Sequence, residues 1–249
     1  MSILPVTVVI PVKNRKKLIL KTLHSLLMQS HHPKEVFIID DCSKDGTWDA
    51  LVDFRETYSV SFSLFLHRIK NGSKGPAKAR NYGISHSSCD LIAFTDSDCI
   101  TDKYWLYKLT YPLRQSDCSN RLVGTGGSVK TFRRDFIGEF FEVMEFLNPP
   151  SNLLYLVTAN CCYKKNALKE IGGFNEDFNL AGGEDSELSL RLRNRGYFFK
   201  FVPTAVVYHC FSSKLRDLIS TFIRYGEGSY LIQKQRIRLD ERLGGLKKQ

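Results

Sequence analysis

The stretch Leu91-Ile92-Ala93-Phe94-Thr95-Asp96-Ser97-Asp98 decides how the rest of the chain is interpreted. Its mostly apolar first half indicates a short buried strand, and two carboxylates one residue apart end it. If the extended geometry continues, Asp96 and Asp98 point to the same side, because side chains alternate along a strand. Such a pair repels itself unless a cation lies beside it, and oxygen ligands suit Mg²⁺ or Mn²⁺. A solvated turn is the alternative, and the neighbouring segments decide between the two.

Composition places the chain among globular proteins. It has 249 residues, of which 43% are hydrophobic, enough for one large domain or a compact pair sharing a sheet. The apolar runs Val6–Val12 and Leu153–Val157 are far shorter than the roughly 20 residues of a membrane span. The sequence opens on a strand pattern without a secretory leader, and its seven cysteines are odd in number and form no Cys-x-x-Cys pair. We therefore expect a cytoplasmic protein with reduced thiols.

The formal net charge of +10 calls for an anionic partner. Much of the excess lies in residues 13–21 and 214–248, which favours a phosphorylated substrate plus a surface contact over a continuous nucleic-acid track. We expect no nucleic-acid partner. Residues 213–249 form a basic amphipathic helical extension, with Leu215, Ile219 and Ile223 on its apolar face. This face either packs over the functional site or attaches peripherally to the cytoplasmic face of a membrane.

Strands and helices alternate through the first hundred residues. Apolar runs predict strands at Pro5–Val12, Glu35–Ile39, Ser61–His67 and Leu91–Thr95, with helical spacing between them and a turn at His31–Pro33. Such alternation requires crossovers onto a parallel sheet, so the predicted fold class is a three-layer α/β/α arrangement with a central, mostly parallel sheet. Polar clusters 13–15, 40–45 and 96–98 follow three strand ends. Ligands bind beyond the carboxyl ends of parallel strands, so these clusters predict a nucleotide site.

Four ordered segments carry a family resemblance: VVIPVKNR at 8–15, IDDCSKDGT at 39–47, GPAKARNYG at 75–83 and FTDSD at 94–98. Together they resemble the family 2 glycosyltransferases, which have a GT-A fold and use nucleotide-sugar donors. The resemblance implies a donor-binding half at residues 1–100, an acceptor and catalytic-base half at 101–212, and the helical extension at 213–249. It also implies a donor-nucleotide site made of Pro11, Val12, Asn14, Arg15, Asp40, Asp41, Arg80, Asp96 and Ser97.

The second half contains a second acidic cluster in Gly182-Gly183-Glu184-Asp185. Acidic residues at a helix start are favoured by the helix dipole, so simple capping would explain them. The resemblance instead implies that Asp185 is the general base, with Glu184 positioning the base or the acceptor. It further implies Asp98 and His209 as metal ligands, Asp96 acting through water. The residues expected beside the acceptor or donor sugar are Asn160, Gly183, Arg224 and Tyr225.

The expected function is an inverting, metal-dependent transfer of one sugar from a nucleotide-sugar donor, a UDP-sugar first, to an acceptor hydroxyl. The cofactor would be Mn²⁺ or Mg²⁺. A single transfer is favoured because the Gln-x-x-Arg-Trp signature and membrane spans of the processive relatives are missing from the sequence. Two alternatives stay open: a nucleotidyltransferase with a similar sheet, which would release pyrophosphate, and a non-catalytic basic protein that binds membranes or nucleic acid. The sequence does not identify the acceptor, because acceptor walls come from variable loops.

Overall fold

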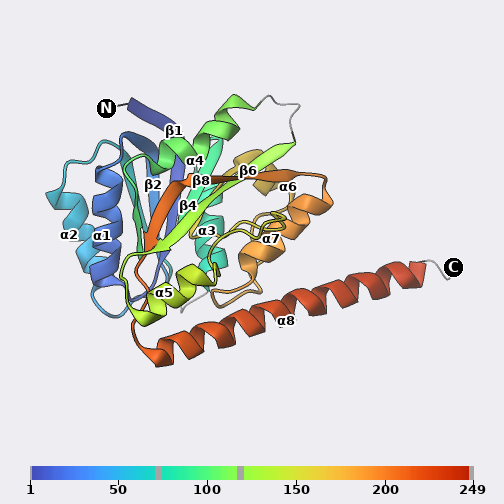
Figure 1. Ribbon diagram of the computed structural model, residues 1–249. Helices are drawn as coiled ribbons and strands as arrows, with labels where there is room; N and C mark the ends of the chain where they lie inside the picture. Colours follow the sequence, from blue (N-terminus) through green and yellow to red (C-terminus); the bar gives the residue numbers. More distant parts are fainter. Residues whose placement is uncertain (1, 71–74, 117–120, 247–249) are drawn as a thin grey trace.

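The structure is a computed structural model that describes residues 2–70, 75–116 and 121–246, with side chains up to residue 234. One mixed sheet, ordered β3-β2-β1-β4-β7-β6-β8-β5, runs through it (Figure 1). The strands are β1 Ser2–Val12, β2 His31–Asp40, β3 Ser63–Arg68, β4 Leu91–Thr95, β5 Cys99–Thr101, β6 Leu122–Thr131, β7 Asn160–Lys164 and β8 Phe198–His209. The helices are α1 Lys16–Leu27, α2 Thr47–Thr57, α3 Gly75–His86, α4 Trp105–Gln115, α5 Phe136–Val143, α6 Lys165–Glu170, α7 Glu184–Asn194 and α8 Leu215–Leu246.

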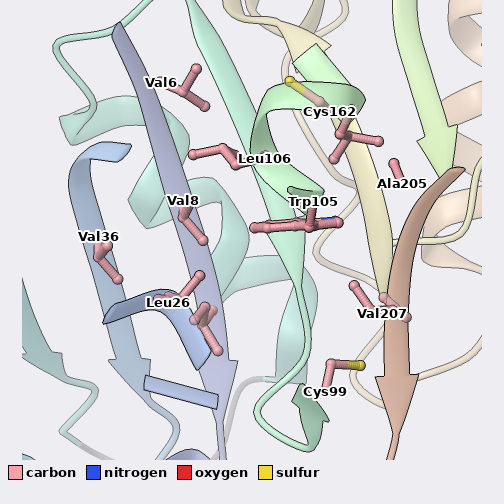
Figure 2. Packing of buried hydrophobic residues seen from close by; sticks show 14 of the residues in the cluster. Val6, Val8, Leu26, Val36, Cys99, Trp105, Leu106, Cys162, Ala205 and Val207 are labelled. Carbon is pink, nitrogen blue, oxygen red and sulfur yellow. The ribbon is translucent and has the colours of Figure 1, made fainter. Parts of the chain in front are cut away.

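Helices cover both faces of this sheet, which confirms the three-layer α/β/α prediction. Side chains of β1 alternate between the two layers: Val8 and Ile10 pack with α1, α2 and α4, whereas Val9 packs with α3, α6 and α7. Figure 2 shows part of the first layer, where Trp105 and Leu106 of α4 lie beside the sheet. The apolar pattern of β1 therefore has the cause expected for a strand buried on both faces.

The sheet changes character halfway along. Strand β1 pairs in parallel with β2 and β4, and β2 pairs in parallel with β3, as the alternating pattern predicts. Strand β7 then runs antiparallel between β4 and β6, and β8 runs parallel to β6 and antiparallel to β5. Four of the seven pairings are thus parallel. Both halves of the chain contribute to one continuous sheet, so residues from each can meet at its edge.

The predicted turn at His31–Pro33 is wrong, because these residues form the start of β2. Pro33 lies opposite Leu4 of β1, and the register between the two strands shifts just after that pair. A proline has no N–H to donate, so it is tolerated where the hydrogen-bond ladder is irregular. The proline that suggested a turn therefore marks an irregularity within strand β2.

Helices α5 and α8 pack against each other through aromatic side chains. Helix α5 ends at Val143, and Glu145 beyond it has a positive φ of 51°. Phe222 of α8 contacts Phe140 and Phe141 in α5, with ring centroids 6.2 Å apart in each pair. Past this contact Gly228 of α8 lies against Gly182, and only the C-terminal part of the helix extends away from the rest of the chain (Figure 1). Among the residues described, no helix has the length and apolar character needed to cross a bilayer.

Candidate active site

One cleft of about 970 Å³ opens at the carboxyl ends of β1, β2 and β4, with α7 and α8 on its far side. The clusters predicted from separate parts of the sequence meet there. The predicted site residues that line the cleft are Pro11, Val12, Arg15, Asp41, Arg80, Asp96, Ser97, Asp98, Gly183, Glu184, Asp185, His209, Arg224 and Tyr225. Three predicted residues do not line it: Asn14, Asp40 and Asn160.

Asn14 and Asp40 build the loop wall behind the cleft surface. Asn14 has a positive φ of 52°, its side-chain oxygen accepts a hydrogen bond from the Lys44 N–H at 2.8 Å, and its own N–H donates to Ser43 Oγ at 2.8 Å. Asp40 is fully buried, where Arg68 Nε lies 3.2 Å from its carboxylate. These contacts fix the loop that presents Asp41 to the cleft. Their role in the structure is therefore to position the donor-side loop.

Asp98 and His209 come together because β5 runs antiparallel to β8, with Cys99 opposite His209. His209 Nε2 lies 3.3 Å from Asp98 Oδ1, and Arg15 Nε lies 3.5 Å from Asp98 Oδ2. The other ring nitrogen of His209 is buried without a hydrogen-bond partner. A carboxylate and an imidazole together fit a divalent cation. Asp98 and His209 are thus the residues that could hold one.

The Cys99 thiol lies within 4.8 Å of ligand atoms of Asp98 and His209. It is nevertheless part of the hydrophobic core, in the same cluster as Val207 (Figure 2). Burial and the charges of Asp96 and Asp98 raise its pKa well above the usual range. The neutral thiol of Cys99 is therefore a packing group.

Arg80 of α3 links the two sides of the cleft. Its guanidinium donates to Glu184 Oε1 at 2.8 Å and to Asp96 Oδ1 at 3.1 Å, and only 2% of the residue is exposed. Burial alone would lower the pKa of Arg80, but the carboxylates of Glu184 and Asp96 raise it. Burial raises the pKa of Asp96, opposed by Arg80 and supported by Asp98. The charged guanidinium of Arg80 thus holds Asp96 and Glu184 together across the cleft.

Asp185 is the second residue of α7, a helix that begins directly after the left-handed Gly183, whose φ is 90°. Its carboxylate accepts hydrogen bonds from the Ser186 N–H at 2.8 Å and from the Thr158 N–H at 3.3 Å. Burial, and then the charge of Glu184, raise the pKa of Asp185 to about 7, against the lowering effect of Arg80. A carboxylate with a pKa near neutrality is suited to accept a proton from a hydroxyl and release it again.

Several cleft residues were not singled out in the sequence. Tyr155 lines the cleft, and burial together with the charge of Asp185 raises its pKa. Lys21 and Arg133 also line the cleft and add positive charge to it. None of the four segments that carry the family resemblance contains Tyr155, Thr158 or Arg133. Residues that line a cleft from separate loops form no local sequence pattern that would identify them.

Asn160 does not reach the cleft, so its prediction as a sugar contact needs correction. It is 1% exposed and accepts a hydrogen bond from Trp105 Nε1 at 2.8 Å. Its amide nitrogen donates to the carbonyls of Ser128 and Ala205, each at 2.8 Å. All of these partners are interior groups. Asn160 therefore joins β7, β6 and β8 beneath the cleft, and its contribution to the cleft is indirect.

Comparison with known proteins identifies the family. The model of the glycosyl transferase family 2 matches residues 7–172, and that of the glycosyl transferase family group 2 matches residues 117–247. The probable glycosyltransferase YdaM of Bacillus subtilis is 27% identical over 82% of this chain, which spans 50% of that relative's length.

Two solved structures share the fold. A mannosyltransferase from Pyrobaculum calidifontis, solved in complex with GDP-Man and Mn²⁺, aligns with a TM-score of 0.71 and 22% identity over 94% of this chain and 64% of its own. Staphylococcus aureus TarS 1-349, in complex with UDP, aligns with a TM-score of 0.65 and 22% identity over 85% of this chain and 61% of its own. The family match covers most of the chain and includes the segments that line the donor side of the cleft. The chain belongs to the family 2 glycosyltransferases.

Proposed function

We propose that this protein is an inverting, metal-dependent glycosyltransferase that moves one sugar from a nucleotide-sugar donor, a UDP-sugar first, to an acceptor hydroxyl. The observation that carries the proposal is the meeting of Asp185, Arg80 and the Asp98–His209 pair in one cleft. These residues come from both halves of the chain. They supply a proton acceptor and a cation-binding pair at the same rim.

In the proposed reaction, Asp185 removes the proton from the acceptor hydroxyl as its oxygen attacks the anomeric carbon. The new glycosidic bond forms on the face opposite the departing group, and the bond between the anomeric carbon and the diphosphate breaks. The nucleoside diphosphate leaves with the electron pair. Direct displacement without a carboxylate nucleophile implies inversion.

A divalent cation, when bound by Asp98 and His209, would neutralise charge on the diphosphate. Arg15 contacts Asp98 and lines the cleft, so its guanidinium is placed to add to this neutralisation. Asp41 and Pro11 lie at the donor end, where a base and a ribose need a hydrogen-bond acceptor and an apolar surface. We expect donor binding to depend on these residues and chemistry on Asp185.

The test of the base is Asp185→Asn, with Asp177→Asn as the control, because Asp177 is exposed and outside the cleft. A panel of UDP- and GDP-sugars is incubated with Mn²⁺, and release of the nucleoside diphosphate is measured. We expect Asp185→Asn to lower release by about 100-fold or more while Mn²⁺-dependent nucleotide binding is kept. Full turnover in this variant would remove Asp185 from the mechanism.

The test of the cation pair is Asp98→Ala, with Asp102→Ala as a control that lies outside the cleft. Binding of UDP is measured by calorimetry with Mn²⁺ and after chelation. We expect Asp98→Ala to bind UDP weakly whether or not Mn²⁺ is present. Metal-dependent affinity equal to that of the parent would contradict the ligand assignment.

The proposal includes a cytoplasmic location, free or at the membrane surface. The six cysteines in the described part of the chain are free, as a reducing compartment requires, and Cys118 lies outside that part. Leu215, Ile219 and Ile223 on α8 are 62%, 54% and 58% exposed. These side chains support peripheral attachment, which flotation with anionic vesicles would test.

A further inference from the structure

We infer that Gly228 is a positioning residue of this enzyme: its missing side chain lets α8 cross the 182–183 loop in backbone contact, which places Arg224 and Tyr225 in the cleft that Asp185 lines. The inference rests on the proposed function, because it concerns the geometry around the proposed base. Gly228 does not itself line the cleft.

The crossing has no room for a side chain on Gly228. A Cβ atom there would lie 2.0 Å from the carbonyl oxygen of Gly182 and 2.6 Å from its carbonyl carbon. Both are backbone atoms, which cannot move aside as the end of a flexible side chain can. Gly228 is also buried, whereas its neighbours Glu227 and Ser229 are exposed. The helix therefore touches the loop at this point through backbone alone.

The loop is equally constrained. Gly182 and Gly183 have φ values of 150° and 90°, which side chains disfavour. A Cβ on Gly183 would lie 3.0 Å from the Gly228 backbone, and one on Gly182 would lie 2.9 Å from the Arg224 carbonyl oxygen. Three glycines thus allow one close crossing of a helix over a loop.

The same loop holds the catalytic acids. The Gly182 N–H donates to Glu184 Oε2 at 2.7 Å, and Glu184 accepts from Arg80 through its other oxygen. Asp185 follows directly in α7. On the helix side, Tyr225 lines the cleft, and burial and the charge of Asp185 raise its pKa. A shift at the crossing would therefore open the surroundings of Asp185 to water.

The contact of Phe222 with α5 is a second anchor of α8, so a shift at the Gly228 crossing should tilt the helix without detaching it. Phe222 holds the beginning of α8 against α5, in contact with Phe140 and Phe146. Phe222 and Gly228 lie nearly two helical turns apart. Enlarging residue 228 should leave the aromatic contact in place and swing the segment after Phe222 away from the loop. Arg224 and Tyr225 lie on that segment.

The experiment compares Gly228→Ala with Gly226→Ala in the full chain. A Cβ on Gly226 meets nothing within 4 Å, and Gly226 does not line the cleft. Both changes replace a helical glycine by alanine, so they share the same gain in helix propensity. The difference between the two variants isolates the contact with Gly182.

The first readout is the pH profile of nucleoside diphosphate release from the nucleotide sugar that the parent turns over. Asp185 faces Glu184, Arg80, Tyr155 and Tyr225, and burial is the largest cause of its raised pKa. In Gly228→Ala, we expect the acid limb to move below pH 7 and turnover to fall about 10- to 100-fold, because the groups around the base are misplaced. UDP affinity with Mn²⁺ should stay within about twofold, since Pro11 belongs to β1 and Asp41 follows β2, neither of which the change at Gly228 touches. Gly226→Ala should match the parent.

The second readout is amide hydrogen exchange after binding of UDP and Mn²⁺. We expect faster exchange in residues 181–186 and 224–232 of Gly228→Ala and unchanged exchange in β1 and β4. Phe222→Ala, which releases the other anchor, serves if Gly228→Ala proves unstable, and it should keep an acid limb near pH 7. The inference would be overturned if Gly228→Ala and Gly226→Ala had the same pH profile and the same hydrogen-exchange rates. It would also be overturned if only Phe222→Ala shifted the acid limb of the pH profile. If the parent releases no diphosphate from any nucleotide sugar, the proposed function fails, and the exchange comparison still decides whether Gly228 holds α8.

Discussion

Replacing Arg80 by methionine should lower the stability of the fold far more than any exchange of a surface arginine. Arg80 and Glu184 are 2% and 3% exposed, and their side chains lie 2.8 Å apart. Methionine fills similar space but leaves the Glu184 carboxylate buried without its cation. Removing one member of such a pair costs about 3–5 kcal/mol. Since folded proteins of this kind are stable by only about 5–15 kcal/mol, the loss should be a large part of the total.

Arg195→Met is the matched control. Arg195 Nη1 lies 3.2 Å from Glu170 Oε1, but the two side chains are 58% and 41% exposed. Water screens this pair, so its removal should cost about 0–1 kcal/mol. Urea unfolding followed by circular dichroism gives both values, with the slope of the unfolding transition checked for each variant.

A double-mutant cycle separates the buried charge from lost packing. Because Glu184→Gln removes the stranded charge, Arg80→Met with Glu184→Gln should lose less stability than the two single changes summed, by about 1–3 kcal/mol. The charge of Arg80 also lowers the pKa of Asp185, so Arg80→Met should move the acid limb of turnover upward. Equal losses in Arg80→Met and Arg195→Met, or a cycle that closes with no coupling, would refute the reasoning.

Four further predictions concern Asp185, Glu35 and Asn160. Turnover should fall as the pH drops below about 7, because Asp185 is then protonated, and a flat pH–rate profile down to pH 5 would exclude it as the base. Because the pKa of Asp185 is raised, the folded state binds the Asp185 proton more tightly than the unfolded state does, and the protein loses stability as the pH rises toward 7. Asp185→Asn should therefore raise the melting temperature at pH 8 but not at pH 4. The pKa of Glu35 is shifted in the opposite direction: burial alone would raise it, but hydrogen bonds from Ser88 and Thr7 lower it. Glu35→Gln should therefore lower the free energy of unfolding by about 1–2 kcal/mol at pH 7 and by little near pH 3. Urea unfolding measures both values, with Glu56→Gln as the control because Glu56 is exposed. Asn160→Ala should lower the free energy of unfolding by about 2–3 kcal/mol, because Trp105 and the carbonyls of Ser128 and Ala205 lose a hydrogen-bond partner, and UDP affinity should not change. Weaker UDP binding by a fully folded variant would show that Asn160 does contribute to the donor site.

The parallel half of the fold could be predicted because its signals are local. Residues 6–12 and 91–95 are apolar runs of strand length, and polar clusters follow them in the sequence. The place of β7 could not be predicted in the same way. It enters between β4 and β6 through pairs such as Phe94 with Cys161, which join distant parts of the chain. Long-range pairing is decided by burial and closure of the whole sheet, and no short pattern records it.

In the candidate site, too, the sequence predicted where the polar clusters lie but not how each single residue is oriented. The sequence predicted the acidic cluster after β2, but not that Asp40 faces the interior and Arg68 while Asp41 faces the cleft. Alternation would place neighbours on opposite sides, yet the direction depends on where the strand ends, and Cys42 with its positive φ of 64° marks that end. Asn14 and Asn160 illustrate the other case: residues of a functional motif that act by holding its shape.

Arg80 explains why motifs from both halves have to be considered together. Seen from the donor side, an arginine near a diphosphate would be expected to face the anion directly. The structure gives two of its nitrogens to Asp96 and Glu184, one on each side of the cleft. A buried guanidinium with two carboxylate partners is held in one orientation, because moving it would strand a charge. Its partners are held with it, so the distance between the donor-side acids and the loop of Asp185 is set before any substrate binds. Under the proposed mechanism, Arg80 thus acts through the geometry it imposes on Asp96 and Glu184, and the loop it fixes is the one that α8 contacts at Gly228.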